Sequence, residues 1–165
     1  NDSGDDAELG DNGEIWVKGK NTLSSYWNNT TATEANIVDG WFRSGDVASC
    51  DEQGFYWFAD RLKHVIISGG ENIYAAELER VIRDLPGLSE LVVVGKPDEK
   101  WGEVPCACVE LREGATEDAA GIIAFCRENL AGFKTPKSVM FGELPKTSTG
   151  KIQKFVLRDR IKEQG

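Results

Sequence analysis

One acidic and one basic residue in the first half of the sequence have side chains that could bind a nucleotide. Asp46 ends the run Arg43-Ser44-Gly45-Asp46, where a carboxylate in a tight turn can accept hydrogen bonds from a vicinal diol such as a ribose. Arg61 carries a planar guanidinium that suits phosphate or ribose oxygens. Taken alone, an Asp after a Gly is usually only a turn residue, and an Arg next to Asp60 is usually only part of a surface ion pair. Each signal is therefore weak without the others.

Two further segments place lysines in polar loops. Thr149-Gly150-Lys151 joins a mobile cation to a glycine, which suits transient neutralisation of phosphate or carboxylate charge. It is not a Walker loop, because the spaced glycine before Gly-Lys is missing. The run from Gly132 to Lys137 combines two lysines with Phe133 and could hold an anionic ligand that has a ring system. The alternatives are a plain solvent-exposed loop and an ordinary helix-to-strand connection.

Residues 60–74 predict a joint between two structural units. A charged connector from Asp60 to His64 leads into Val65-Ile66-Ile67, an apolar β-branched run that predicts a short buried strand. Ser68-Gly69-Gly70 follows, where the backbone can adopt positive φ or let a ligand approach closely. A helix is predicted near residues 75–85, ending at Pro86-Gly87, because apolar residues recur there at helical spacing: Leu78, Val81, Ile82 and Leu85.

The segment before this joint predicts a small antiparallel sheet. Alternation over residues 14–18 indicates a half-buried strand, and residues 21–36 predict a loop with room for one helical turn. Residues 45–46 predict a Gly-Asp turn, and 47–50 and 55–58 predict a hairpin. Residues 1–59 are too few to form a good core alone.

The segment after the joint predicts an α+β unit. Strands are expected at 88–95, 104–112 and 138–142, with a loop at 96–102. Pro105 favours an edge strand or a strand start. Thr116 is expected to cap a helix that ends just before Gly132. A flexible polar loop is expected at 145–151, and a last helix at 152–162.

Composition excludes several classes of protein. The 165 residues are 40% apolar and 28% charged, which favours a packed soluble fold. A net charge of −9 argues against nucleic acid or an anionic membrane as the main partner, but not against a small phosphorylated ligand. No apolar run reaches the ~20 residues of a membrane helix, and the acidic start at Asn1 predicts no signal peptide. A cytoplasmic protein is expected.

The cysteines predict reduced, buried thiols rather than bridges or metal ligands. Cys106 and Cys108 would share one face of a strand, which is poor geometry for a mutual disulfide. With a single histidine in the sequence, a zinc site is not expected either, so no metal site is predicted.

The order and spacing of these segments resemble the adenylate-forming superfamily, which includes acyl-CoA synthetases, adenylation domains of nonribosomal peptide synthetases and firefly luciferase. Residues 41–46 look like its Tyr-Arg-Thr-Gly-Asp motif, with Ser44 in place of a common Thr. Residues 60–79 look like its hinge motif, although His64 stands where Asp is frequent, and residues 145–151 look like its C-terminal lysine motif. The likeness runs from Gly13 to the C-terminus and is strongest to fatty-acid–CoA ligases.

The resemblance implies a role for each matching residue. Asp46 would bind the ribose hydroxyls of ATP, and Arg61 would lie near the ribose and phosphate. Lys151 would bridge the carboxylate substrate and the α-phosphate, and Lys63 would be the hinge for rotation of the C-terminal domain. The other implied positions line the pantetheine tunnel (Gly69 and Gly70) or contact CoA (Trp101, Phe133, Lys134 and Lys137).

The resemblance also implies the architecture and the activity. The expected fold is α+β: residues 1–60 are the end of a large N-terminal domain, and residues 61–165 are a small mobile domain with a mostly antiparallel sheet flanked by helices. The whole protein would join a carboxylic acid, here a fatty acid, to CoA at the expense of ATP, with the Mg²⁺ ligands and acyl pocket upstream. This fragment alone is expected to be inactive.

Three other functions remain open from the sequence. The first is an amino-acid-activating domain of a peptide synthetase, with a carrier protein as the thiol donor. The second is a non-catalytic interaction module that kept the fold, and the third is a luciferase-like oxygenase. The acyl chain length and the oligomeric state cannot be derived from these residues.

Overall fold

The computed structural model describes residues 4–164, which form two compact units that divide between Lys63 and His64. A short 3₁₀ helix, η1 (Leu62–His64), spans this division. The boundary predicted between residues 60 and 61 falls earlier, inside strand β4 (Tyr56–Arg61). Both units combine sheet and helix, so the predicted α+β class is confirmed.

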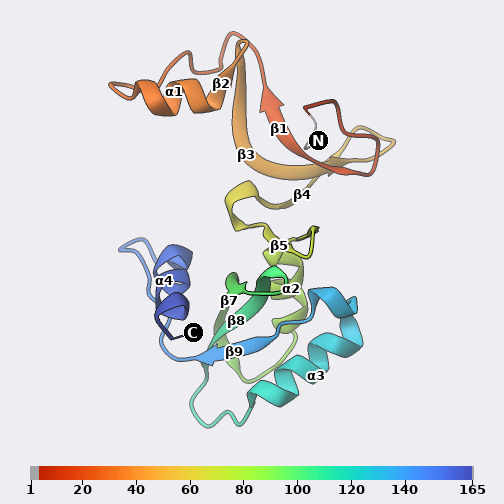
Figure 1. The fold of residues 1–165 in the computed structure, drawn as a ribbon, viewed down its shortest axis with the longest axis vertical. Coiled ribbons are helices and arrows are strands. Elements are labelled where there is room, and N and C mark those ends of the chain that lie inside the picture. The colour runs from red at the N-terminus through yellow and green to blue at the C-terminus, as the bar shows by residue number, and fades with distance from the viewer. Residues whose placement is uncertain (1–3, 165) are drawn as a thin grey trace. The chain divides into compact units, whose positions relative to one another are not determined.

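The N-terminal unit, which ends at Lys63, is built around one long strand. Strand β3 (Trp41–Cys50) pairs antiparallel with β1 (Asn12–Val17), β2 (Ile37–Val38) and β4, as Figure 1 shows. The predicted small antiparallel sheet is therefore confirmed. Helix α1 (Thr30–Asn36) is longer than the single turn expected, and it begins where the Asn29 side chain accepts a hydrogen bond from the Ala32 amide.

The predicted Gly-Asp turn at residues 45–46 is wrong, because both residues lie inside β3. Gly45 has φ of +71°, but the strand continues on both sides of it: Val47 pairs with Glu14, and Asp46 pairs with Arg61. The chain does not reverse at this positive φ. Instead, the register of β3 shifts against both β1 and β4 close to Gly45. The reversal occurs earlier, in the two-residue turn between β2 and β3 at Asp39-Gly40, where both φ values are positive.

The C-terminal unit, which begins at His64, has a five-stranded sheet with helices on both faces. The strands are β5 (Ile66–Ser68), β6 (Glu71–Ile73), β7 (Leu88–Asp98), β8 (Gly102–Leu111) and β9 (Ser138–Phe141). Their pairing is antiparallel in the order β6-β5-β8-β7, and β9 pairs parallel with β8. The helices are α2 (Ala75–Ile82), α3 (Ala119–Asn129) and α4 (Lys154–Gln164), with a short 3₁₀ segment η2 (Gly132–Lys134).

The core of this unit follows from the two-residue period of its strands. Val93 of β7 and Val109 of β8 point to one face, where they pack with buried residues of α2 and α3 such as Leu78 and Ile122. The alternate residues of the same strands point to the other face and pack with Leu144, Leu157 and Ile161, the last two from α4. A strand buried on both faces requires a continuous apolar run, which is why residues 91–94 are all apolar.

Several local predictions in this unit are wrong. The strand predicted at Val65-Ile66-Ile67 is only partly buried, because the Ile67 side chain is 57% exposed. β7 extends to Asp98, so the expected loop at 96–102 is reduced to residues 99–101. Asp118, not Thr116, caps α3, because its carboxylate accepts a hydrogen bond from the Gly121 amide. The helix ends at Asn129, so Gly132 begins η2 instead of terminating α3.

Pro105 lies in a central strand and not at the predicted edge or strand start. On one side of β8, Gly102 pairs with β5, and pairing with β9 starts at Cys106. The Pro105 carbonyl accepts a hydrogen bond from the Lys137 amide on this side, so its nitrogen faces the gap between the two partner strands. A missing N–H therefore costs no ladder hydrogen bond at that position.

The four cysteines are free thiols, as predicted. Cys106, Cys108 and Cys126 are buried, whereas Cys50 is only partly buried. Within residues 4–164, no helix is both long and apolar enough to cross a membrane.

Candidate functional site

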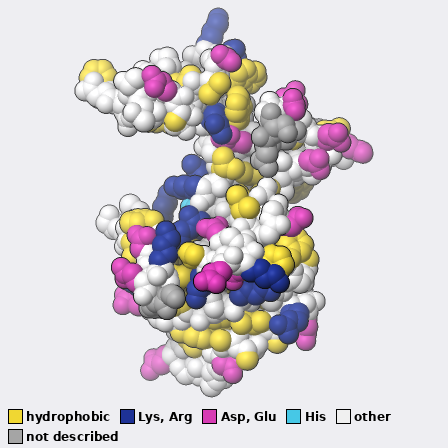
Figure 2. Space-filling model, viewed as in Figure 1, with side chains coloured by type: hydrophobic (Ala, Val, Ile, Leu, Met, Phe, Trp, Pro, Cys, Tyr) yellow, Lys and Arg dark blue, Asp and Glu magenta, His cyan; other side chains and the backbone are white. Residues whose placement is uncertain are grey.

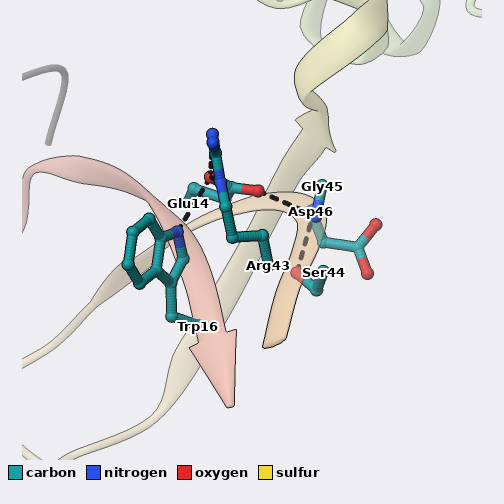
Figure 3. A network of polar contacts seen from close by, with 6 residues as sticks. All are labelled: Glu14, Trp16, Arg43, Ser44, Gly45 and Asp46. Atoms are coloured by element: carbon teal, nitrogen blue, oxygen red, sulfur yellow. Dashed lines mark hydrogen bonds and ion pairs between the residues drawn. The ribbon is translucent and has the colours of Figure 1, made fainter. Parts of the chain in front are cut away.

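A polar network in the N-terminal unit centres on Glu14 of β1 (Figure 3). The Glu14 carboxylate accepts hydrogen bonds from Arg43 Nη2 at 2.9 Å, from Trp16 Nε1 at 2.8 Å and from the Gly45 amide at 3.1 Å. The Arg43 guanidinium also lies 5.3 Å from the centre of the Trp16 ring. The network therefore fixes the backbone at Gly45, immediately before Asp46.

The Asp46 carboxylate points away from the Glu14 carboxylate (Figure 3). It forms an ion pair with Arg61. Asp46 Oδ1 lies 2.9 Å from Arg61 Nη1, and the Asp46 amide donates to Ser44 Oγ at 3.0 Å. The Asp46 side chain is 33% exposed, so its carboxylate can still accept hydrogen bonds from a ligand. The two residues predicted to bind ATP, one before and one after the β3–β4 turn, are thus brought together by cross-strand pairing.

A groove of about 360 Å³ lies beside this pair within the N-terminal unit. Its lining comes from the sheet, from α1 and from the end of the unit: Glu14, Tyr26, Ala35, Asn36, Arg43, Ser44, Gly45, Arg61, Leu62 and Lys63. Three of these residues, Arg43, Arg61 and Lys63, are basic and one, Glu14, is acidic, so the lining as a whole suits an anionic ligand.

Loss of the Glu14 carboxylate is expected to destabilise this unit in a pH-dependent way. Burial opposes ionisation, but the hydrogen bonds from Trp16, Arg43 and Gly45 outweigh it, so the pKa of Glu14 lies below its usual 4.5. A lowered folded-state pKa stabilises the fold above the unfolded-state pKa, and this stabilisation is lost as the pH falls through the folded-state value. We therefore expect Glu14→Gln to lower the free energy of unfolding by at least about 1 kcal/mol at pH 7, with a smaller difference near pH 3.

Denaturant unfolding of both proteins between pH 7 and pH 3 measures this difference. Glu34→Gln is the matched control, since Glu34 is an exposed carboxylate on α1 of the same unit. An equal loss of stability at every pH would contradict the role of the ionised Glu14 carboxylate.

In the C-terminal unit, Gly69 and Gly70 form the two-residue turn between β5 and β6. Their φ values are +60° and +89°, which L-residues with a side chain rarely adopt. The Gly69 amide donates to the Trp101 carbonyl at 2.8 Å, and a Cβ at Gly69 would lie 2.8 Å from Trp101 Cε3. The structure thus brings together the predicted tunnel residues and Trp101, and Gly69 is required by both its backbone angle and the close indole ring.

The other residues predicted to contact CoA lie around η2. Lys134 Nζ binds both carboxylate oxygens of Glu77, at 2.8 and 2.7 Å, and it also lies 5.7 Å from the centre of the Phe133 ring. Phe133 and Lys137 are exposed. Lys134 would have to leave or share Glu77 to bind a phosphate, so Phe133 and Lys137 are the more available of the three.

Lys151 lies in a tight turn before α4 that is closed by its own hydrogen bonds. The Thr147 amide donates to the Lys151 carbonyl at 2.8 Å, and the Lys151 amide donates to Thr147 Oγ1 at 3.1 Å. Gly150, with φ of +83°, makes the turn possible, and Lys146 and Ile152 form a bridge at its base. The segment predicted as a flexible loop is therefore a hydrogen-bonded turn, and the Lys151 side chain is exposed where this turn closes opposite Thr147.

Sequence reasoning missed the acidic residues that hold these basic ones. Glu14 binds Arg43 and fixes the Gly45 backbone just before Asp46. Glu77 binds Lys134, and Glu79 of α2 binds Lys154 at 2.7 Å. The two-residue period that places Glu14 and Trp16 on one face of a strand was recognisable in the sequence. The pairing of Glu14 with Arg43 on strand β3 was not. In the described part of the chain, no group of three or more His, Cys, Asp or Glu side chains could hold a metal ion.

Comparison with known proteins shows which enzymes this chain resembles. Residues 77–151 match the family model of the AMP-binding enzyme C-terminal domain. The chain is 47% identical over 94% of its length to the 2-succinylbenzoate–CoA ligase of Listeria monocytogenes, of which it covers 33%. It is 44% identical over 95% of its length to a long-chain-fatty-acid–CoA ligase of Mycobacterium tuberculosis, of which it covers 32%.

A solved structure extends the likeness to three dimensions. ATP-bound MatB from Rhodopseudomonas palustris aligns with 96% of this chain and 32% of its own, with 38% identity and a TM-score of 0.87. Residues 77–151 therefore belong to the AMP-binding enzyme C-terminal domain family, and nearly the whole chain is similar to adenylate-forming enzymes, as the sequence motifs predicted. It corresponds to the C-terminal part of these enzymes, and it spans about a third of the length of the curated relatives that it matches.

Proposed function

We propose that this chain is the C-terminal part of an ATP-dependent acyl-CoA ligase. The observation that carries the proposal is its similarity, over nearly its whole length, to enzymes that are named as CoA ligases. Three polar residues that such a reaction would use are present in this part: Asp46, Arg61 and Lys151. The whole enzyme would convert a carboxylic acid, ATP and CoA into acyl-CoA, AMP and pyrophosphate, through an acyl-adenylate.

The N-terminal unit supports a place within a larger domain. Its strand β4 and the preceding turn expose Phe55, Tyr56, Trp57 and Phe58, each more than 60% accessible. Figure 2 shows apolar side chains on the visible face of this unit. Burial of such side chains is favourable at roughly 25 cal/mol per Å², so we propose that upstream residues of the whole protein cover them.

The first half-reaction would use Asp46, Arg61 and Lys151. The Asp46 carboxylate would accept hydrogen bonds from the two ribose hydroxyls of ATP, and its pairing with Arg61 at 2.9 Å holds it in place. Arg61 would also approach the phosphate. The Lys151 ammonium would neutralise the charge that the carboxylate and the α-phosphate bring together, which lowers the barrier to their reaction.

The second half-reaction needs an open path for the thiol, which an inserted Lys151 would obstruct. We propose that the C-terminal unit rotates about Lys63, next to which the two units divide, and presents the Gly69–Gly70 turn instead. Gly70 faces open space that could admit a pantetheine chain, and Trp101, which packs against Gly69, would contact CoA together with Phe133, Lys134 and Lys137. Magnesium, which such a reaction needs, is not assigned to any residue of this chain.

A fatty acid is our proposed substrate, on the strength of the motif likeness. The relatives do not select it, because identity is nearly the same to a ligase named for succinylbenzoate and to one named for long-chain fatty acids. The acyl pocket would lie in the upstream domain, so this part of the chain says little about the acid.

A screen of the full-length protein tests the proposal. Pyrophosphate release is measured with fatty, aryl and amino acids, with and without CoA. We expect release with at least one fatty acid and conversion to acyl-CoA when CoA is added, while the 165-residue chain alone shows none. Release only with amino acids, and no use of CoA, would instead favour an amino-acid-activating domain, and no release with any acid would contradict the proposal.

A further inference from the structure

The turn that carries Lys151 is tied to the rest of the C-terminal unit by an ion pair on each side. Before the turn, Lys146 Nζ lies 2.9 Å from Glu90 Oε1 of β7. After it, Lys154 Nζ lies 2.7 Å from Glu79 Oε1 of α2. The two pairs differ in exposure: the side chains of the first are 37% and 42% accessible, and those of the second are 16% and 17%. Water screens the second pair far less, so it is the stronger constraint.

Glu79 is itself held by the sheet. The same oxygen that binds Lys154 also accepts a hydrogen bond from the Val93 amide of β7 at 2.9 Å. Val93 is fully buried in the core. Glu79 therefore connects a rigid strand to the beginning of α4, across 75 residues of sequence.

Lys154 occupies a position where a cation is normally unfavourable. It is the first residue of α4, where the helix dipole is positive and the backbone amides lack helical partners. A cation at that position, in a largely buried setting, needs an anion close to it. The Glu79 carboxylate supplies that anion, 2.7 Å from the Lys154 ammonium.

We propose that Glu79, acting through Lys154, is a positioning residue that sets the location of the Lys151 ammonium. Lys151 lies three residues before Lys154, and the Gln153 amide between them donates to the Pro145 carbonyl at 2.8 Å. Because hydrogen bonds between Thr147 and Lys151 close the turn, a shift of the first turn of α4 moves Lys151 and the turn together. Misplacement of a reacting group by about 1 Å can cost a factor of about 10² in rate. This inference rests on the proposed role of Lys151 in adenylation.

The test compares the two half-reactions in the full-length protein. Glu79→Gln keeps an oxygen for the Val93 amide and removes the charge, while Lys154→Gln removes the other partner and leaves Glu79 bonded to Val93. We expect each to slow pyrophosphate release about tenfold or more, mainly in kcat. Thioester formation from supplied acyl-adenylate should change by less than about twofold. The double variant should be no slower than the worse single variant, because the two residues act as one pair.

Lys162→Gln is the matched control, since Lys162 is an exposed lysine near the other end of α4. It should leave both half-reactions unchanged. An equal fall in both half-reactions, or no fall in pyrophosphate release in either variant, would overturn the positioning role. If Glu79→Gln does not fold, Lys154→Gln carries the same test.

Lys151→Ala, measured in the same assays, distinguishes a failure of the proposed role of Lys151 from a failure of the positioning role of Glu79 and Lys154. If it abolishes pyrophosphate release while Glu79→Gln and Lys154→Gln keep it, only the positioning inference fails. If Lys151→Ala itself keeps it, the proposed role of Lys151 fails, and the positioning inference falls with it.

Discussion

Replacement of Lys151 by alanine in the full-length protein is expected to reduce adenylation by a factor of about 10²–10³, the usual cost of losing one group that stabilises transition-state charge. The side chain is exposed, and Lys151 contributes to its turn through backbone groups that alanine keeps, so loss of the side chain should not disturb the fold. Thioester formation from supplied acyl-adenylate should continue at a near-normal rate, because the step in which Lys151 neutralises the carboxylate and α-phosphate charge has then already taken place. Pyrophosphate release and acyl-CoA formation, measured separately, give the two rates.

Two observations would argue against this role of Lys151. One is an equal loss of both half-reactions, which would indicate a general defect in folding or binding. The other is an unchanged rate of pyrophosphate release. Lys162→Ala, at an exposed lysine on α4, controls for the loss of one positive charge from the same unit.

Replacement of Lys63 by proline is expected to give the opposite pattern. Lys63 lies in η1, and the two units divide immediately after it. Proline fixes φ near −65° and removes the amide hydrogen, so it restricts rotation at that residue. We expect pyrophosphate release to stay within a few-fold of normal while acyl-CoA formation slows about tenfold or more, because the C-terminal unit can no longer leave its first orientation.

Lys63→Ala distinguishes the backbone effect from the loss of the side chain. It removes the same side-chain interactions but leaves φ free, so it should form acyl-CoA at a near-normal rate. A normal rate in the proline variant, or the same slow rate in both variants, would remove Lys63 as the hinge.

The sequence predicted best where local pattern and tertiary packing require the same thing. The run at residues 91–94 is apolar throughout because the sheet is covered on both faces, and that run was recognisable as a strand. The stripe of Leu78 and Ile82 predicted α2, and both side chains are fully buried. The Gly69–Gly70 turn needs positive φ at both positions, and a pair of adjacent glycines predicts such a turn from the sequence alone.

The errors arose where a residue type fits two structures equally well. Gly45 suits a turn, but it also suits an irregularity inside a strand, and only the pairing of β3 with β1 and β4 decides between them. Thr116 and Asp118 are both good helix caps, and the helix begins after the second. Pro105 is normally excluded from a central strand, and it is tolerated here because two partner strands leave a gap beside it.

The sequence alone drew attention to Asp46 and to the basic residues of the candidate site, but not to the acidic residues that hold the basic ones. Glu79 and Lys154 are 75 residues apart, and nothing in the local sequence pairs them. Their contact depends on the packing of α2 and α4 against β7, which is a property of the folded unit. Support of this kind is therefore found only in the structure.

The most direct test of the account measures both half-reactions in Lys151→Ala and Lys63→Pro side by side. If one mobile unit serves two steps with two different surfaces, the first variant loses adenylation and keeps thioester formation, and the second keeps adenylation and loses thioester formation. Failure of both variants in the same half-reaction, or in both, would contradict the alternation on which the proposed mechanism depends.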